Sequence, residues 1–396
     1  MASNGKAGVW LQASKWSTDV GCSCAKEGDR LTQPPGRRAT RDDVAHLANV
    51  SPATVSNVLN GRQVSQELSS RVYAAIAELE YIPNQAARSL MTRSSRQIGF
   101  MMENLRSAQL LDVVQGAQYE ALRQGYTLSI SLYTQDHLQI ILQDYLQRNI
   151  EGIICEANAH IDLEDWHRLS SVPIIRLGLL PGDVNLVADY YGGMRQAYQV
   201  LYNMGHRDFV HISGLEDTLR DGRYVEERLA AFVDCQAEHG VRAPARIITG
   251  TPPYTPNQHD GYRLMQELLA RRVPFTTAIM SADLMALGAI QALREAGFTV
   301  PGDVSVVSFN NTHLATTSYP ALSSMSVPSF HIGCDAVREM LTARGHDPLP
   351  PMADVTPQRS QADGHVMLRY PMEFIARQSS APMLHDGYES SLWRRK

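Results

Sequence analysis

From residue 97 onward, short apolar segments alternate with longer segments of helical periodicity. Such alternation is typical of parallel β-sheets, because each parallel strand needs a crossover connection before the next strand. A segment of roughly 250–280 residues is long for one sheet, so we expect two lobes. The predicted strands are Ile98–Met102, Thr127–Leu132, Gly152–Glu156, Pro173–Leu177, Phe209–Ser213, Ile247–Thr249, Thr277–Ser281 and Val304–Phe309. The predicted helices include Leu110–Gln124, Gly192–Met204, Tyr224–His239 and Leu284–Ala296.

Composition excludes several classes of protein. With 396 residues, 44% of them hydrophobic, the chain can form two or three domains. It contains no apolar run long enough to span a bilayer and no signal-peptide core, so we expect a cytoplasmic, nucleoid-associated protein without a membrane partner. Five scattered cysteines fit free thiols better than a redox or zinc site: Cys22, Cys24, Cys155, Cys235 and Cys334.

Charge is distributed unevenly along the chain. The formal net charge is −5, but residues 37–96 carry +3 and residues 1–36 carry +1, which leaves −9 for the remainder. A small basic segment on a large acidic body is expected if only that segment contacts phosphate.

Residues 40–79 carry the start and stop signals of three short helices. Thr40 and Asp43 match a capping box, and Ser51 followed by Pro52 predicts a second helix that runs to Leu59. Ser65 is positioned to cap a third helix. The inward-facing residues that helical spacing predicts are Val44, Leu47, Ala48, Val55, Val58, Leu59, Leu68, Val72, Ile76 and Leu79.

The first two helices and their short connection fit a helix-turn-helix. The outward face of the second helix carries small and hydrogen-bonding side chains, which suit base edges and phosphates in a major groove. These are Ala53, Thr54, Ser56 and Asn57. The alternative is a three-helix packing unit whose polar face only meets water.

The segment TRDDVAHLANVSPATVSNVLNG resembles the DNA-binding motif of the LacI/GalR family. The resemblance implies that Pro52, Ala53 and Asn57 contact bases. It also implies that Ser51, Thr54, Ser56 and Asn60 fix the helix on phosphates. Asn57 stands where the family usually has arginine, and asparagine prefers adenine where arginine prefers guanine.

A short segment with small residues follows Pro83. By itself it fits a plain linker, because so short a helix is marginal alone. The resemblance implies instead a hinge helix that orders on DNA beside its copy in the partner chain. Arg88 would contact DNA there, and Leu90 would insert into the minor groove and open a base step.

The resemblance continues through the body in MGHRDFVHISG, in SADLMALGAIQALREAGFTVPGDVSVVSFNNT and in MEFIARQSS. It implies a periplasmic-binding-protein-like body with an effector between two lobes. Arg228 matches the family arginine that binds effector hydroxyls or carboxylates. Weaker candidates for the same site are Asp283, Asn310, Tyr254, Phe330, Ser107 and Gln109. Asp283 fits a helix cap equally well, and Tyr254 and Phe330 fit plain core residues.

Two departures from the family pattern concern the effector. Ala282 replaces the usual asparagine, and Asn310 and Asn311 replace the usual pair of aspartates. Asparagine amides still bond sugar hydroxyls. The loss of up to two negative charges would also make a phosphorylated sugar or a sugar acid better tolerated.

The predicted fold class is α/β, with an all-α helix-turn-helix head and a two-lobed body with parallel sheets. The predicted parts are an extension (1–38), the head (39–83), the hinge (84–96), the effector and dimerisation domain (97–380) and a polar tail (381–396). We expect a homodimeric repressor of carbohydrate genes with no catalytic site, metal or cofactor. It would bind a roughly palindromic operator and a sugar-like effector. The alternatives are a sugar-binding protein without a regulatory role and a regulator that responds to a nucleobase or phosphorylated sugar.

Overall fold

The computed structural model describes residues 39–59, 62–82, 94–156, 159–179, 182–213, 226–241, 246–250, 257–351, 355–362 and 365–383, and the two-residue strands at 219–220 and 223–224. By internal contacts the chain divides into two compact units, Met1–Arg88 and Ser89–Lys396. We refer to them as the head and the body. No helix in the described ranges has the length and apolarity that a bilayer crossing requires.

The head consists of three helices, α1 (Arg41–Leu47), α2 (Pro52–Leu59) and α3 (Gln66–Glu78). The predicted capping box is confirmed, because Thr40 caps the N–H of Asp43 while the Asp43 carboxylate accepts from the N–H of Thr40. The hydroxyl of Ser65 accepts from the N–H of Leu68 at 3.4 Å, which confirms the third predicted cap.

A small apolar core holds the three helices together. Its fully buried members are Val44, Ala45, Ala48, Val55, Val58, Val72 and Ala75. The prediction for Leu47 is wrong, because its side chain is 41% exposed. Leu47 is the last residue of α1, and the buried residues of this helix are Val44 and Ala45.

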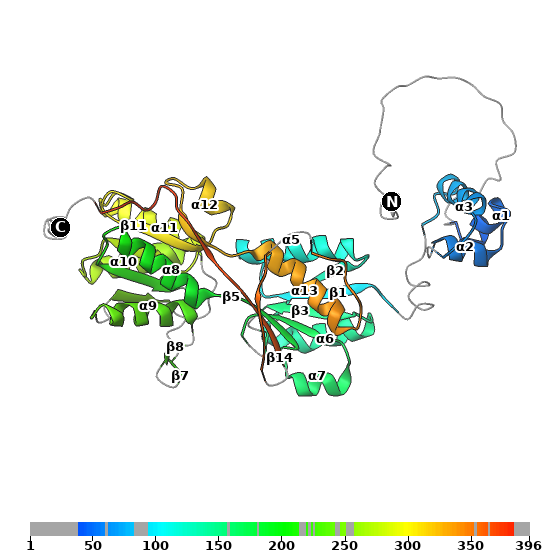
Figure 1. Cartoon of the computed structure of the whole chain (residues 1–396), viewed down its shortest axis with the longest axis horizontal. Helices are drawn as coiled ribbons and strands as arrows, with labels where there is room; N and C mark the ends of the chain where they lie inside the picture. Colours follow the sequence, from blue (N-terminus) through cyan, green and yellow to red (C-terminus); the bar gives the residue numbers. More distant parts are fainter. Residues whose placement is uncertain are drawn as a thin grey trace, which may run out of the picture. The chain divides into compact units, whose positions relative to one another are not determined.

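The N-terminal lobe of the body is a seven-stranded sheet with the order β13-β14-β5-β4-β3-β1-β2. All neighbouring strands are parallel except the pair β13 and β14. Helices α5 and α13 cover one face, and α6 and α7 cover the other (Figure 1). The strands are β1 (Gln97–Met102), β2 (Thr127–Leu132), β3 (Gly152–Glu156), β4 (Ile174–Leu177), β5 (Val184–Ala188), β13 (Gln358–Ala362) and β14 (His365–Tyr370). The helices are α5 (Ala108–Arg123), η1 (Gln135–His137), α6 (Leu138–Gln147), α7 (Leu163–Leu169) and α13 (Ser329–Ala343).

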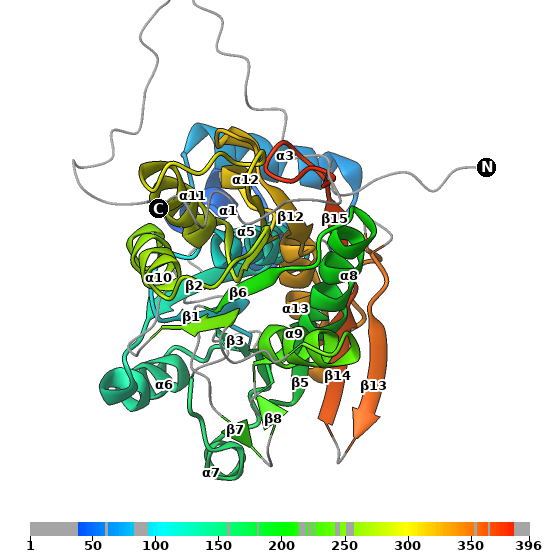
Figure 2. The ribbon, with the colours of Figure 1, turned by 90° about the vertical axis from the view of Figure 1, so that its left-hand side faces the viewer.

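The C-terminal lobe is a six-stranded sheet with the order β15-β12-β11-β10-β6-β9, parallel except at β15. Helices α8 and α9 pack on one face, and α10 and α11 pack on the other (Figure 2). The strands are β6 (Phe209–Ser213), β9 (Ile247–Thr249), β10 (Thr277–Met280), β11 (Ser305–Asn310), β12 (Ser323–Ser326) and β15 (Glu373–Ile375), with a separate pair β7 (Leu219–Arg220) and β8 (Arg223–Tyr224). The helices are α8 (Tyr190–Asn203), α9 (Glu227–Glu238), α10 (Gln258–Ala270), α11 (Asp283–Glu295) and α12 (His313–Thr317).

The chain crosses between the lobes three times, from β5 to α8, from β12 to α13 and from β14 to β15. Each crossing starts at the carboxyl end of a strand. Because the strands within each sheet run parallel, the carboxyl ends of both sheets are directed toward the other lobe. The expected two-lobed body with parallel sheets is therefore confirmed, and most predicted strands agree within one residue.

Glycines allow a close approach of paired helices in both lobes. A Cβ atom on Gly116 in α5 would overlap the carbonyl oxygen of Phe330 in α13, and one on Gly333 would overlap that of Val113. The pair α10 and α11 is built in the same way around Gly261 and Gly288. Backbone fills the space that a side chain would need, so these positions require glycine.

We therefore predict that Gly116→Ala lowers the free energy of unfolding by about 1–3 kcal/mol, because α5 and α13 must move apart. Gly193→Ala is the control, since its Cβ would meet the flexible end of Met372 at 2.6 Å rather than backbone. Urea unfolding of both variants measures the difference. Equal stability of Gly116→Ala and the wild type would contradict the packing described here.

Candidate DNA-binding and effector sites

Helix α2 presents one face to the head's core and another outward. Val55 and Val58 are buried, whereas Ser51, Pro52 and Ala53 are exposed at the start of the helix. The Ser51 hydroxyl accepts from the N–H of Thr54 at 3.1 Å, so it caps the helix as predicted. The start of α2 therefore exposes small side chains and backbone, which suits close approach to DNA.

The other predicted DNA contacts of α2 are half-buried. Thr54, Ser56 and Asn57 belong to this group, and the Thr54 and Ser51 hydroxyls are 2.9 Å apart. Asn60, Arg88, Leu90 and Tyr254 lie outside the described residues. Their assigned roles remain predictions.

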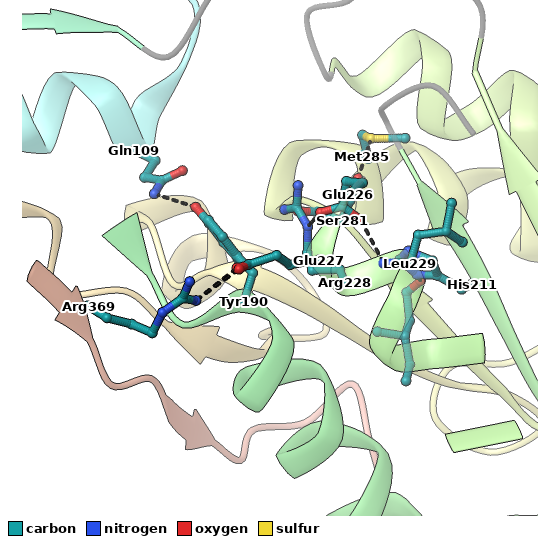
Figure 3. A network of polar contacts seen from close by, with 11 residues as sticks. Gln109, Tyr190, His211, Glu226, Glu227, Arg228, Leu229, Ser281, Met285 and Arg369 are labelled. Atoms are coloured by element: carbon teal, nitrogen blue, oxygen red, sulfur yellow. Dashed lines mark hydrogen bonds and ion pairs between the residues drawn. The ribbon is translucent and has the colours of Figure 1, made fainter. Parts of the chain in front are cut away.

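Arg228 lies in the first turn of α9, in the C-terminal lobe. Its Nε donates to the carboxylate of Glu226 at 2.6 Å, and its Nη1 donates to the carbonyl oxygen of Ser281 at 2.7 Å. The guanidinium carbon lies 4.6 Å from the ring centroid of Tyr190 and 5.6 Å from that of Phe309. Figure 3 shows Arg228, Glu226, Ser281 and Tyr190 together beside the start of α9. Two of the five N–H donors of Arg228 are therefore already bound within the protein.

Glu226 is a site residue that was absent from the predicted set. It is the N-cap of α9 and accepts from the N–H of Leu229 at 2.7 Å. Burial raises the pKa of its carboxyl group, but the charge of Arg228, the nearby His211 and its hydrogen bonds outweigh burial and hold the pKa below its usual value. Glu226 is therefore ionised at neutral pH. A glutamate in the N-cap position, two residues before the matched arginine, is the feature of the sequence that could have identified it.

His211, in the middle of β6, is fully buried beside this ion pair. Its Nδ1 donates to the carbonyl oxygen of Ile279 at 2.8 Å, and its Nε2 has no hydrogen-bond partner. Burial lowers the pKa of His211 to about 4, although the charge of Glu226 acts in the opposite direction. The imidazole is therefore neutral at neutral pH, and Glu226, Arg228 and His211 together carry no net charge.

Asp283 has its hydrogen-bonding capacity filled by the protein. It is 1% exposed and accepts from the hydroxyls of Ser308 (2.5 Å), Ser324 (2.8 Å) and Thr312 (2.8 Å) and from the Thr312 N–H (2.6 Å). Four donors match the approximately four lone-pair positions of a carboxylate. The geometry therefore favours a structural role that links α11 to β11 and β12.

Asn310 and Asn311 follow one another at the end of β11. Both have positive φ angles, 98° and 52°. Asn311 donates to Ser326 at 3.1 Å and accepts from Arg377 at 2.7 Å. The Oδ1 atom of Asn310 is buried without a hydrogen-bond partner, so it is an acceptor that a ligand could satisfy.

The remaining candidates lie in the N-terminal lobe. Ser107 caps α5 by accepting from the Leu110 N–H at 3.2 Å. Gln109 donates to the Tyr190 hydroxyl at 2.9 Å, which joins the start of α5 to the start of α8 across the lobes (Figure 3). Phe330 packs with its ring centroid 5.6 Å from that of Tyr119, so it belongs to the α5–α13 contact rather than to the set around Arg228.

A second ionisable group lies at the carboxyl ends of β1 to β4. The N–H of Glu103 donates to the carboxylate of Glu156 at 2.9 Å, and burial together with the Glu103 charge raises the pKa of Glu156. Arg176 is 1% exposed and donates to the carbonyl oxygens of Glu156 and Ala159. The Tyr133 hydroxyl is buried without a hydrogen-bond partner. None of these residues was among the predicted site residues. In the sequence, the feature that could have identified them is their position at or near the ends of predicted strands.

In the described part of the chain, no cluster of three or more His, Cys, Asp or Glu side chains could hold a metal ion. The described cysteines Cys155, Cys235 and Cys334 are free. Burial raises the pKa of the Cys155 and Cys235 thiols to about 11, so both are protonated at neutral pH.

Comparison with known proteins identifies both parts of the chain. Residues 40–84 match the model of the bacterial regulatory proteins of the lacI family, and residues 198–380 match that of the periplasmic binding protein-like domain. The chain is 30% identical over 315 residues to the HTH-type transcriptional repressor PurR of Escherichia fergusonii. This match covers 76% of the chain and 89% of PurR.

Solved structures share the fold. The lac repressor dimer bound to operator and the anti-inducer ONPF matches 87% of the chain and 100% of its own, with a TM-score of 0.70 and 22% identity. The complex of the transcriptional regulator CelR with cellobiose matches the same shares, with a TM-score of 0.59 and 24% identity.

We predict that Asp283→Asn lowers the free energy of unfolding by about 1–3 kcal/mol, because the amide leaves at least one buried donor unsatisfied. The control is Asp144→Asn, which removes a surface ion pair to Arg148 whose side chains are 41% and 55% exposed and should change stability by less than about 0.5 kcal/mol. Thermal and urea unfolding check both values. An unchanged free energy of unfolding in Asp283→Asn would show that this carboxylate is not structural.

Proposed function

This chain belongs to the lacI family of bacterial regulatory proteins, and from that membership we propose that it is a homodimeric repressor released from or recruited to its operator by a small sugar-like effector. Membership makes the chain a DNA-binding transcription regulator rather than an enzyme. The repressor role, the dimer and the nature of the effector are the proposed parts.

The observation that carries the DNA-binding proposal is the geometry of α2. The helix packs Val55 and Val58 into the head while Ser51, Pro52 and Ala53 remain exposed at its start. A recognition helix needs this combination of a fixed inner face and an outer face that fits a groove. Two heads related by a two-fold axis require inverted half-sites, so the operator should be roughly palindromic.

Two observations support an effector between the lobes. The carboxyl ends of both sheets are directed toward the opposite lobe, and ligands of open α/β sheets bind beyond the carboxyl ends of strands. Polar residues with unsatisfied hydrogen-bonding atoms lie at these ends in both lobes, Tyr133 in one and Asn310 in the other. The relative CelR was solved with cellobiose, which supports a sugar-like effector by analogy.

Selection from randomised DNA by the purified protein tests the proposal. We expect enrichment of an inverted repeat, bound with a strong dependence on salt concentration because phosphate contacts release counterions. Analytical ultracentrifugation with the selected duplex should give two chains per site. Enrichment of a single half-site bound by one chain would contradict the proposed dimer.

On the selected operator, Asn57→Ala should lose about 1–3 kcal/mol of discrimination at one base pair of each half-site while affinity for mixed-sequence DNA stays nearly unchanged. The control Asn203→Ala, at an exposed position of α8 in the body, should leave both affinities unchanged. Fluorescence anisotropy with single-base operator variants measures the effect. A uniform loss on all sequences would assign Asn57 to phosphate instead.

A further inference from the structure

The charge of Arg228 is already balanced before any effector binds. Glu226 pairs with its Nε at 2.6 Å, and the two side chains are only 8% and 10% exposed. An ion pair so shielded from water is weakly screened by salt and acts on any ligand nearby. An anion that approaches Arg228 therefore meets the Glu226 carboxylate at the same time.

The carboxyl ends of the strands in the N-terminal lobe add further negative charge. Glu103 directly follows β1 and Glu156 ends β3, while Arg176 lies one residue before the end of β4. Arg176 is itself buried and donates to backbone carbonyl oxygens. Arg106, in the loop that follows β1, is exposed, so the charge argument rests on the buried Glu226–Arg228 pair rather than on the N-terminal lobe.

Two neutral polar atoms without partners lie at the carboxyl ends of strands, one in each lobe. They are the Tyr133 hydroxyl after β2 and Asn310 Oδ1 at the end of β11, both buried and without a hydrogen bond. Asn310 Oδ1 can only accept, so it requires a ligand that donates a hydrogen bond, such as a hydroxyl or a ring N–H. An ionised phosphate or carboxylate group offers only acceptors, so this atom needs a donor elsewhere on the ligand.

We propose that Glu226 makes the effector site selective for uncharged effectors, such as neutral sugars, by neutralising Arg228 and repelling phosphate and carboxylate groups. This inference rests on the proposed function, because it assigns a chemical class to the effector of that site. It reverses the expectation from Asn310 and Asn311 that a phosphorylated sugar or a sugar acid is better tolerated. Glu226 acts here as a specificity-determining residue.

The test uses inorganic phosphate as the probe and the full-length protein. Wild type, Glu226→Gln and the double variant Glu226→Gln/Arg228→Gln are unfolded thermally in phosphate and in chloride at matched ionic strength. Glutamine keeps the volume and the acceptor that caps the Leu229 N–H but removes the charge. In Glu226→Gln the unbalanced Arg228 should bind phosphate at least about tenfold more tightly than in the wild type. The double variant should lose that gain.

Each outcome either supports or overturns the proposal. A saturable stabilisation of the wild type by phosphate overturns it, and this measurement does not depend on whether the variants fold. Folded Glu226→Gln without a gain in phosphate affinity also overturns it, and so does a gain that persists in the double variant. A wild type indifferent to phosphate, with a gain that appears only in Glu226→Gln, supports it.

A companion thermal-shift screen of the wild type compares neutral sugars with their phosphates and acids. Neutral members should bind at least about tenfold more tightly than their anionic counterparts, and preferred binding of an anionic member contradicts the proposal. Selection of an operator is measured separately. If the protein selects no operator, the proposed regulatory function is wrong. The phosphate experiment then still tests the charge selectivity of the site.

Discussion

The direction of the parallel strands is the constraint on which the body depends. Both sheets send the chain across at the carboxyl ends of strands, at Ala188, Ser326 and Tyr370. The residues that end a parallel strand in one lobe therefore lie at the edge of the sheet nearest the other lobe. This arrangement places Arg228, Glu226 and Asn310 on one side and Glu103, Glu156 and Arg176 on the other, although they come from distant parts of the sequence. A ligand between them contacts both lobes, so its binding free energy can shift their arrangement.

Polar contacts between described residues already join the lobes in this arrangement. Gln109 donates to Tyr190, whose ring lies beneath the Arg228 guanidinium, and Arg369 of β14 donates to Glu227 at 2.9 Å beside the start of α9 (Figure 3). The residues around Arg228 therefore touch both the candidate effector region and the lobe contact. An effector that changes the position of Arg228 also changes the surroundings of Tyr190. This connection provides a physical route from ligand binding to lobe movement.

Much of this architecture is predictable from the sequence, for physical reasons that particular residues show. Strands such as Thr127–Leu132 stand out through apolar, β-branched residues, and the caps at Thr40, Ser51 and Ser65 define the head. Strand β12, with the sequence SSMS, does not stand out. Its buried serines are stabilised by hydrogen bonds to residues far along the chain, including Asp283 and Ser379. The pairing of Arg228 with Glu226 also depends on tertiary burial, which local sequence does not reveal.

The central claim is that a small uncharged effector binds between the carboxyl ends of the two sheets, with Arg228 already neutralised by Glu226. A crystal structure of the full chain with the neutral compound that stabilises it most tests this claim directly. The account predicts ligand density between the two lobes, a ligand donor within hydrogen-bonding distance of Asn310 Oδ1, and a Glu226–Arg228 pair that stays intact. Density elsewhere on the molecule, or an Arg228 released from Glu226 to bind the ligand with both terminal nitrogens, would contradict it.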